Sequence, residues 1–334
     1  MRIELLQQLA CPGCGGGLTL LGHGGTTGEI DEGTVRCEAC SSEFPLRGGI
    51  ARFVTAIDSD ISRRTRRVYD FTWGHLGETE VHREWEKDSY EYMLLIPEGL
   101  VGGVAKVGME AGCGGGADLL RVGARGGTVI GFDLSGGVDV ARRLTRHLDG
   151  VEIVQGDLNR LPFKPACFDF IYSFGVLHHL ADPQDSFARL AALLKPGAPL
   201  VTYLYEDRAD RSKLDKALLR IVSSLRRWSS RFPPLFLYSA CWSMVPFVWL
   251  TFAAPARALR SLSPALADGL PFAHTMRPSV LAADLFDRFA PPVEWRFSER
   301  QVRQLYARAG LERVEIRRHR GWVSWGFKPG GAFS

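Results

Sequence analysis

The chain has 334 residues, a length that predicts about two domains rather than one. Hydrophobic residues make up 46% and charged residues 23%, which is the composition of a folded protein and excludes a mainly disordered chain. The formal net charge of +4 is too small to indicate nucleic-acid binding by itself. Seven cysteines in a chain of this length do not indicate a disulfide scaffold, and the first ten residues do not resemble a secretory signal. We therefore expect a cytoplasmic protein.

Composition divides the chain into five segments, which we take as candidate domains: 1–55, 56–103, 104–206, 207–290 and 291–334. The third segment alternates short apolar runs with helical stretches, the pattern of a parallel sheet covered by helices. The last segment predicts a helix and two further strands that complete this sheet. We expect an α/β fold with a mainly parallel, seven-stranded sheet, whose strands are Val104–Glu110, Thr128–Asp133, Val151–Gln155, Phe168–Phe174, Ala198–Tyr205, Arg313–Arg318 and Trp322–Phe327, with a helix over Glu299–Ala309.

Two C-x-x-C pairs stand in the first segment, Cys11 with Cys14 and Cys37 with Cys40. Zn²⁺ prefers four soft ligands in a tetrahedron, and each pair presents two thiolates to one ion. A closed four-cysteine shell leaves no open position, so we predict a structural zinc. The sequence around these pairs, CPGCGGGLTL and RCEACSSEFPLRGGIARFV, resembles the small zinc-ribbon proteins that act as activator subunits of tRNA and release-factor methyltransferases.

A glycine-rich turn, Gly112–Gly116, follows a short apolar strand and precedes a helix, as in nucleoside-binding folds. Asp133, 21 residues after Gly112, fits an acid that binds ribose in either a nicotinamide or an adenosine cofactor. Glu110 favours the second class, because an acid at the strand end would repel a pyrophosphate and attract a cationic sulfonium cofactor with its amino group. Asp157 and Leu158 end the third strand, where they can contact an adenine ring.

Five sequence motifs together resemble those of a known enzyme family. EAGCGGG, GFDLS, QGDLNRLPF, FDFIYSFGVLHHLADP and LLKPGAPLVTYLY are similar to the successive motifs of class I S-adenosylmethionine-dependent methyltransferases, in the same order, over residues 104–206. The resemblance implies a Rossmann-like core with S-adenosylmethionine as the methyl donor. It places the cofactor's methionine part at Glu110, Gly112 and Gly114, its ribose at Asp133, its adenine at Asp157 and Leu158, and its edge at Ser173.

Six residues outside this cofactor set are candidates for the acceptor side. Methyl transfer mainly requires alignment of donor and acceptor, and a base is needed only when the acceptor loses a proton. His178 and His179 stand at a helix start beside the expected methyl position, where one can act as the base or both can pack as structural residues. The remaining candidates flank the core. Tyr69 and Trp73 precede it and can cover the cofactor on the acceptor side or pack in the interior, and Trp295 and Arg296 can line the acceptor site.

The fourth segment holds an apolar stretch, 232–256, that runs for 25 residues without a charge. This exceeds the ~20 residues that span a bilayer, but Pro246 should interrupt a single spanning helix near its middle. The stretch can therefore be a buried lid over an apolar acceptor, an interfacial helical pair on anionic lipid, or a spanning helix. The helix before it has an apolar face and a basic border, formed by Leu214, Ala217, Leu218, Ile221, Val222, Leu225 and Trp228 and by Lys213, Lys216, Arg220, Arg226, Arg227 and Arg231.

These features favour methyl transfer to a small apolar or lipid-linked metabolite, with residues 211–257 carrying the acceptor pocket and making peripheral contact with the inner face of the membrane. An rRNA or tRNA base methyltransferase with the ribbon as RNA reader is the first alternative, supported by the arginines of 63–67. Aromatic and basic residues do not alternate as on an RNA platform, so we do not expect a nucleic-acid partner. A non-catalytic cofactor-binding or partner-binding module is the second alternative. The acceptor atom and the oligomeric state stay open.

Overall fold

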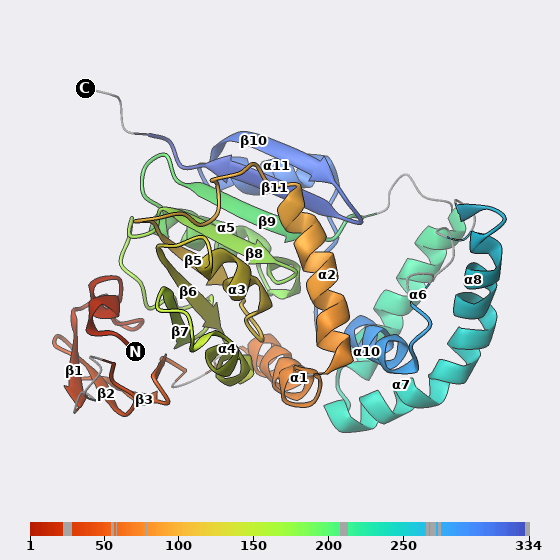
Figure 1. Cartoon of the computed structure of the whole chain (residues 1–334), viewed down its shortest axis with the longest axis horizontal. Helices are drawn as coiled ribbons and strands as arrows, with labels where there is room; N and C mark the ends of the chain where they lie inside the picture. The colour runs from red at the N-terminus through yellow and green to blue at the C-terminus, as the bar shows by residue number, and fades with distance from the viewer. Residues whose placement is uncertain are drawn as a thin grey trace.

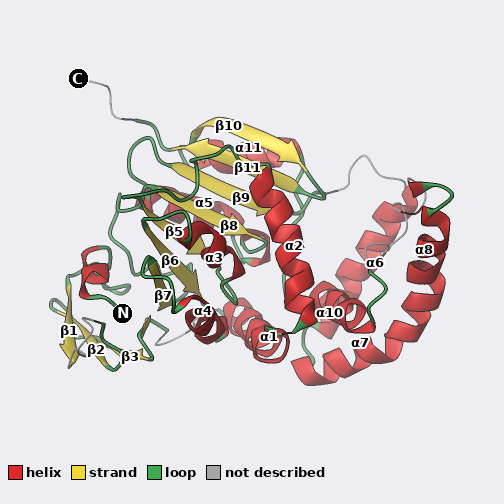
Figure 2. Ribbon diagram, viewed as in Figure 1, coloured by secondary structure: helices red, strands yellow, loops and turns green. Residues whose placement is uncertain are grey.

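The computed structural model describes residues 1–22, 29–54, 57, 59–77, 79–207, 213–264, 267, 272 and 275–330. One sheet of eleven strands runs through the molecule in the order β1-β2-β3-β4-β7-β6-β5-β8-β9-β11-β10 (Figure 1). The N-terminal strands β1, β2 and β3 lie at one end of the molecule, and a group of long helices lies at the other (Figure 2). The seven strands β5 to β11 form the Rossmann-like core that the sequence predicts.

Five strands of this core are parallel, and two follow as an antiparallel pair. The parallel strands are β5 (Val107–Ala111), β6 (Thr128–Asp133), β7 (Val151–Gln155), β8 (Phe170–Phe174) and β9 (Pro199–Leu204). The strand β11 (Trp322–Phe327) pairs antiparallel with both β9 and β10 (Glu312–Arg318).

Two of these strands begin two or more residues later than the sequence predicts. The first core strand begins at Val107 instead of Val104, because Val104 is exposed and Ala105 has a positive φ of 62° that breaks the extended backbone. Phe168 makes only an isolated bridge to Leu194, so β8 begins at Phe170.

Four helices connect the core strands: α3 (Ala117–Gly123), α4 (Gly137–Thr145), α5 (Pro183–Leu193) and α11 (Glu299–Arg308). The two longest have side-chain caps at their first turns. The Asp182 carboxylate accepts from the Asp185 amide before α5, and Ser298 and Gln301 form a reciprocal capping box before α11. These caps fix where each connection leaves the sheet, and therefore where the strand ends present their side chains.

The ribbon consists of a short helix η1 (Ile3–Gln7) and the strands β1 (Leu18–Gly22), β2 (Gly33–Cys37), β3 (Glu43–Arg47) and β4 (Ile50–Arg52). It does not form a separate sheet, and the expected number of seven strands is wrong for this reason. β4 pairs in parallel with β7, through Ala51 opposite Val154, and joins the ribbon hairpins to the core sheet. Ile50 and Ala51 are fully buried in this joint, which covers the edge of β7 that would otherwise expose unpaired backbone groups.

Seven helical segments form a second layer beside the core: α1 (Asp60–Leu76), α2 (Glu80–Leu94), α6 (Lys213–Ser229), α7 (Pro234–Val248), the π-helical turn η3 (Trp249–Ala253), α8 (Ala254–Arg260) and α10 (Pro278–Phe289). We call α6, α7, η3 and α8 the arm, which lies at the outer side of α10 (Figure 1). Leu237, Cys241 and Val245 on α7 pack against α1 and α10 in an apolar cluster that includes Phe71 and Phe286.

Two expectations for the apolar stretch need correction. The helix continues from Pro234 to Arg260 through Pro246, so this proline does not interrupt it. A π-helical turn follows three residues later and accommodates the local change in the helical hydrogen-bond pattern. The stretch is also not a fully buried lid. Its most apolar window has a mean hydropathy of 1.5, but only 22% of that window is buried. By length and composition alone, this helix could cross a membrane.

Candidate functional site

The parallel strands β5, β6, β7 and β8 end at one edge of the sheet, and the predicted cofactor residues gather there. Glu110 lies in β5, Asp133 ends β6 and Ser173 lies in β8. The glycine turn connects β5 to α3 at the same edge, with Gly112 at a φ of +87° and Gly116 at +85°. A Cβ at Gly112 would lie 2.3 Å from the Val176 side chain, so only glycine fits there. This edge is where open α/β sheets bind ligands.

Glu110 is a carboxyl group held almost out of water. It is 4% exposed, and the Tyr172 hydroxyl donates a hydrogen bond to its Oε2 at 3.0 Å. Burial raises the pKa of Glu110 well above its usual range, and the nearby carboxylate of Asp118 raises it further. A cationic amine placed beside this group would restore its ionised form, whereas an anionic pyrophosphate would not. The predicted contact of Glu110 with the amino group of S-adenosylmethionine is compatible with these surroundings and stays a prediction.

Asp133 connects the glycine turn to the loop after β6. Its Oδ2 accepts from the Gly114 amide at 2.9 Å, and its Oδ1 accepts from the amide and the hydroxyl of Ser135, both at 2.7 Å. Burial raises the pKa of this carboxyl, and the hydrogen bonds from Ser135 and Gly114 oppose the rise. The carboxylate thus fixes two loops that border the cofactor site. Its predicted contact with a ribose is compatible with this position and stays a prediction.

The side chains of three other predicted cofactor residues contact other parts of the protein. Asp157 accepts from the amide of Asn159 at 2.9 Å and from its side-chain nitrogen at 2.8 Å. Leu158 is buried in the main apolar core. Ser173 is fully buried, and its hydroxyl donates to the Ala111 carbonyl at 2.7 Å, which joins β8 to β5. Their adenine and cofactor-edge roles stay predictions, since these contacts give each residue a structural role.

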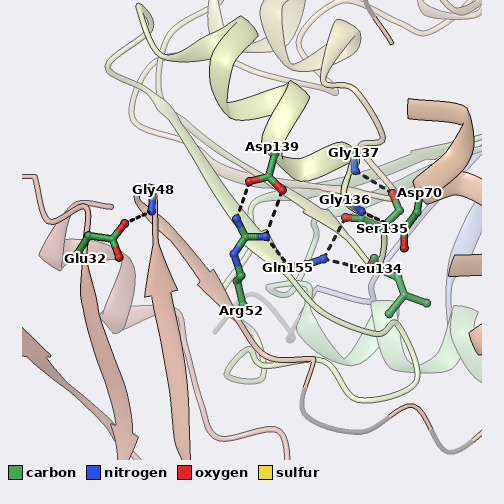
Figure 3. A network of polar contacts seen from close by, with 10 residues as sticks. All are labelled: Glu32, Gly48, Arg52, Asp70, Leu134, Ser135, Gly136, Gly137, Asp139 and Gln155. Carbon is green, nitrogen blue, oxygen red and sulfur yellow. Dashed lines mark hydrogen bonds and ion pairs between the residues drawn. The ribbon is translucent and has the colours of Figure 1, made fainter. Parts of the chain in front are cut away.

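Trp73, a candidate for covering the cofactor on the acceptor side, lies against the glycine turn. A Cβ at Gly114 would lie 2.3 Å from the Trp73 indole, and one at Gly115 would lie 3.1 Å from it. Asp70, three residues earlier on α1, accepts from the Gly136 amide at 2.6 Å (Figure 3). Helix α1 therefore covers both loops of the cofactor site, and the two glycines allow its indole to approach.

The two histidines lie in the short helix η2 (Leu177–His179) after β8 and have different surroundings. His178 is fully buried and stacks on Tyr205 at 3.9 Å between ring centroids; neither ring nitrogen has a hydrogen-bond partner among the described residues. Burial lowers its pKa well below the usual value, so the ring is neutral. His179 Nδ1 lies 2.9 Å from the Val293 carbonyl, which can only accept. Its Nδ1 therefore carries the proton, and Nε2 is left as the basic nitrogen.

The other acceptor candidates surround these histidines. The ring of Tyr69 lies 6.1 Å from that of His179. The Trp295 amide donates to the His178 carbonyl at 2.8 Å, and its indole nitrogen donates to the Leu180 carbonyl at 3.0 Å. The Arg296 guanidinium lies 5.2 Å from the ring centroid of Tyr205. The structure thus brings Tyr69, Trp295 and Arg296 to the histidine helix, whereas Trp73, one turn after Tyr69 on α1, contacts the glycine turn.

Two carboxyl groups of this region had not been predicted from the sequence. Glu294 pairs with Arg296 at 2.9 Å and with Arg226 of the arm at 2.8 Å. Burial alone would raise the pKa of Glu294, but the two arginines lower it overall. Burial raises the pKa of Asp287 on α10, and His179 opposes this rise. An isolated acid next to an apolar run, as in FDRFAPPVEW, is the signal that could have indicated both.

The four cysteines of the ribbon meet in one cluster, with their Sγ atoms within 4.8 Å of one another. Cys11 and Cys40 lie 3.7 Å apart, and Cys14 and Cys37 lie 3.5 Å apart. Four sulfurs in a tetrahedron around Zn²⁺ are separated by about 3.8 Å. The cluster therefore has the size and the ligand chemistry of a structural zinc site.

The ribbon also contacts the cofactor loops through Arg52 in β4. Its guanidinium binds Asp139 of α4 at 2.5 Å and the Gln155 Oε1 at 2.9 Å (Figure 3). Gln155 in turn donates from Nε2 to the carbonyls of Leu134 and Ser135, both at 3.2 Å. These two carbonyls belong to the loop that holds Asp133. A continuous polar network therefore joins the ribbon to the cofactor site.

Comparisons with known proteins agree with this geometry. Residues 109–202 match the protein-family model described as a methyltransferase domain. A tRNA U34 carboxymethyltransferase of Pseudoalteromonas translucida is 33% identical over 128 residues, covering 36% of this chain and 38% of that protein. A fatty-acid O-methyltransferase of Mycolicibacterium smegmatis is 36% identical over 107 residues, covering 31% of this chain and 37% of that protein.

Among solved structures, a complex containing the Haloferax volcanii Trm112 methyltransferase activator aligns with 82% of this chain and 100% of its own, at a TM-score of 0.45 and 14% identity. The chain spans less than two fifths of the length of both curated relatives. The matched residues cover the glycine turn and most of the five parallel core strands, and do not include β10 or β11. The chain therefore contains a methyltransferase domain of the class I, S-adenosylmethionine-dependent type, with a four-cysteine ribbon joined to its sheet.

Proposed function

We propose that this protein transfers a methyl group from S-adenosylmethionine to a small apolar or lipid-linked acceptor. The observation that carries the donor assignment is the buried Glu110 below the glycine turn, next to the Asp133 network. The cofactor supplies an activated methyl group on a sulfonium. The chain's part is to hold the amino group at Glu110, to order the loops through Asp133, and to cover the glycine turn with Trp73.

The zinc belongs to the ribbon and has a structural role in this proposal. Cys11, Cys14, Cys37 and Cys40 would hold it with no position left for a substrate. Metal binding would supply the folding free energy of the ribbon, since its strands are short. The Arg52 contacts then let the folded ribbon support the loop after β6.

His179 is the residue we assign to proton removal. Its Nδ1 is fixed by the Val293 carbonyl, so Nε2 can take a proton from a hydroxyl or amine acceptor. Asp287 and Tyr69 are its neighbours. His178 has no such arrangement, because it is fully buried against Tyr205. We therefore propose His179 as the base and His178 as a packing residue.

The acceptor class is inferred from the parts outside the core. The two curated relatives match the core but are named for a tRNA and for a fatty acid. The core thus does not decide the acceptor. The helical layer supports an apolar or lipid-linked one, because the arm is apolar and its residue Arg226 reaches Glu294 beside the histidine helix. We propose a cytoplasmic enzyme that works at the inner face of a membrane.

A tRNA or rRNA base is the second candidate acceptor. The relative named for a tRNA favours it, as does a ribbon that could read RNA. Proteins that bind nucleic acid contact the phosphate backbone with basic and polar groups. The large apolar surface of the arm therefore does not favour RNA as the acceptor. A non-catalytic module is a third candidate. The presence of the glycine turn, Glu110 and Asp133 together at one edge of the sheet argues against it.

The experiment supplies methyl-labelled S-adenosylmethionine to the full chain with three acceptor fractions from one bacterial lysate: organic-extracted lipid, RNA and small polar metabolites. The proposal expects label in the lipid fraction, which is lost in Glu110→Gln and strongly reduced in His179→Gln. Label confined to RNA would replace the acceptor class. If no fraction is labelled although the protein binds the cofactor, the catalytic assignment is wrong.

A further inference from the structure

The first helix of the arm is turned with its apolar side outward. In α6, the polar residues Arg226 and Ser229 are buried, whereas Ile221, Leu225 and Trp228 are each at least half exposed. Arg226 donates to the Arg288 carbonyl, and Ser229 donates to the Phe289 carbonyl, so polar contacts attach the helix to the rest of the protein. The outward side chains line an open hollow of about 390 Å³ together with Arg220 and Ser224. A helix in water ordinarily has the opposite orientation.

The apolar surface continues from α6 into the next helix. Trp228, Phe232 and Phe236 form a chain of ring contacts across the turn, at 4.5 and 5.3 Å between centroids. The outer side of α7 and η3 then exposes further large apolar side chains, and four of them are about 60% exposed: Leu235, Phe236, Phe247 and Leu250. Isolated exposed apolar residues are common, but a continuous surface of this kind marks a binding site.

The hydroxyl groups of this outer side are satisfied within the helix. Ser239 donates to the Leu235 carbonyl, Ser243 donates to the Ala240 carbonyl, and Thr251 donates to the Phe247 carbonyl, at 2.7 to 2.9 Å. Their donor protons therefore need no water when the surface leaves an aqueous environment. Unsatisfied polar groups would otherwise oppose contact with hydrocarbon.

Charge decides which occupant fits this surface. Between residues 219 and 264 the sequence holds six arginines and no acidic residue. Arg226 is buried in its ion pair, and the five others are exposed around the apolar surface: Arg220, Arg227, Arg231, Arg257 and Arg260. A second copy of the chain bound through the same surface would bring two sets of arginines together, which like-charge repulsion opposes. Anionic headgroups around an apolar layer match both the charge and the apolar centre.

We propose that the arm docks on the surface of a bilayer that contains anionic lipid. The inner side of α7 is already packed on α1 and α10 through Leu237, Cys241 and Val245, so lipid can surround only its outer half. The helix therefore lies on the membrane and does not cross it. The biological role of this docking rests on the proposed function. Arg226 connects the docked helix to Glu294, so a lipid-linked acceptor in the same membrane would arrive beside His179.

The test is flotation of the full-length protein with two kinds of vesicle, one of phosphatidylcholine and one of equimolar phosphatidylcholine and phosphatidylglycerol. We expect flotation with the anionic vesicles, weakening with salt, and little with the neutral ones. Arg231→Gln and Arg257→Gln should each lower the partition coefficient about fivefold, which corresponds to the ~1 kcal/mol of one basic residue near an anionic surface. Arg308→Gln, an exposed arginine of α11, is the matched control and should change nothing.

A second variant pair tests the apolar part. Leu235→Glu and Phe247→Glu place a charge on side chains that are already exposed, so folding should be kept, and flotation should be nearly abolished. Val104→Glu makes the same change at an exposed apolar residue outside the arm and should float normally. The absence of flotation with anionic vesicles would overturn the proposal, as would equal effects of all three changes. A dimer dispersed by Leu235→Glu, without lipid binding, would assign the surface to a second copy.

Cofactor binding separates this inference from the proposed function. Leu235→Glu should bind S-adenosylmethionine as the unchanged protein does, because its side chain lies outside the cofactor site. Flotation with no methyl transfer to any lipid would keep the docking surface and contradict the acceptor class. Methyl transfer to lipid by a protein that does not float would keep the acceptor class and contradict the docking surface.

Discussion

Arg226 and Glu294 form a buried ion pair, with 2.8 Å between Nη2 and Oε2 and side chains only 5% and 4% exposed. The arginine comes from the arm, and the carboxylate comes from the segment that contacts both histidines of η2. Glu294 also binds Arg296, so one carboxylate joins the arm to the floor of the proposed acceptor site. This pair also explains why α6 turns its apolar side outward, since the charged residue must face its partner.

Arg226→Met should therefore destabilise the protein strongly. Removing one member of a buried pair leaves the other charge without full compensation, which costs about 3–5 kcal/mol. Arg296 still neutralises part of Glu294, so we expect the lower end of that range. The free energy of unfolding in urea measures this. Arg227→Met, the exposed neighbour, should change it by about 0.5 kcal/mol or less. Equal effects of the two substitutions would show that the pair does not hold the arm.

Cys37→Ser should remove the zinc and also weaken cofactor binding. The loss of one ligand opens the metal site, and the ribbon then loses the free energy that folds it. Without an ordered β4, Arg52 no longer holds Gln155, whose amide fixes the loop carbonyls of Leu134 and Ser135. We expect about a tenfold loss of S-adenosylmethionine affinity, the equivalent of one or two hydrogen bonds.

Elemental analysis and calorimetry check the two parts separately. Cys167→Ser changes a cysteine outside the cluster and should keep both the metal and the affinity. A metal-free protein before any substitution would refute the zinc site. Unchanged affinity in a metal-free Cys37→Ser variant would refute only the coupling through Arg52.

Substitution of the two adjacent histidines should have different effects on the rate of methyl transfer. His179→Gln removes the nitrogen that accepts the proton and should lower kcat about a hundredfold or more with a hydroxyl or amine acceptor, the usual contribution of a general base. It should leave cofactor affinity unchanged. His178→Phe replaces a buried ring whose nitrogens have no partner among the described residues, and it should keep the rate. The reverse order of the two effects would reassign the base.

The core strands and the metal ligands could be predicted from the sequence because their signals are local. Short apolar runs mark strands that are buried on both faces, and Thr128–Asp133, Val151–Gln155 and Trp322–Phe327 have the predicted bounds. Two C-x-x-C pairs bring four thiols together whatever the loop between them does. The three-residue strand β4 is too short for such a signal, so the continuous eleven-stranded sheet could not be predicted.

The acceptor side could not be predicted because its contacts join distant parts of the chain. Helical periodicity identified the apolar face of α6, but a pattern does not say which side of a helix faces the protein. That choice depends on Glu294, 68 residues after Arg226. The position of Trp73 on the glycine turn likewise depends on how α1 packs, so the sequence left open whether this indole covers the cofactor or packs in the interior.

Calorimetry of S-adenosylmethionine binding tests the central claim most directly, because that claim rests on Glu110. Burial raises the pKa of this carboxyl in the free protein, and a bound ammonium favours the ionised form and so lowers it. Binding should therefore release a proton, and affinity should rise with pH until Glu110 is ionised in the free protein, then level off. Glu110→Gln should abolish the proton release and weaken binding by about 1.5–3 kcal/mol. Glu299→Gln, an exposed carboxylate of α11, should change neither. Unchanged affinity in Glu110→Gln, or tighter binding of a nicotinamide dinucleotide, would contradict the assignment.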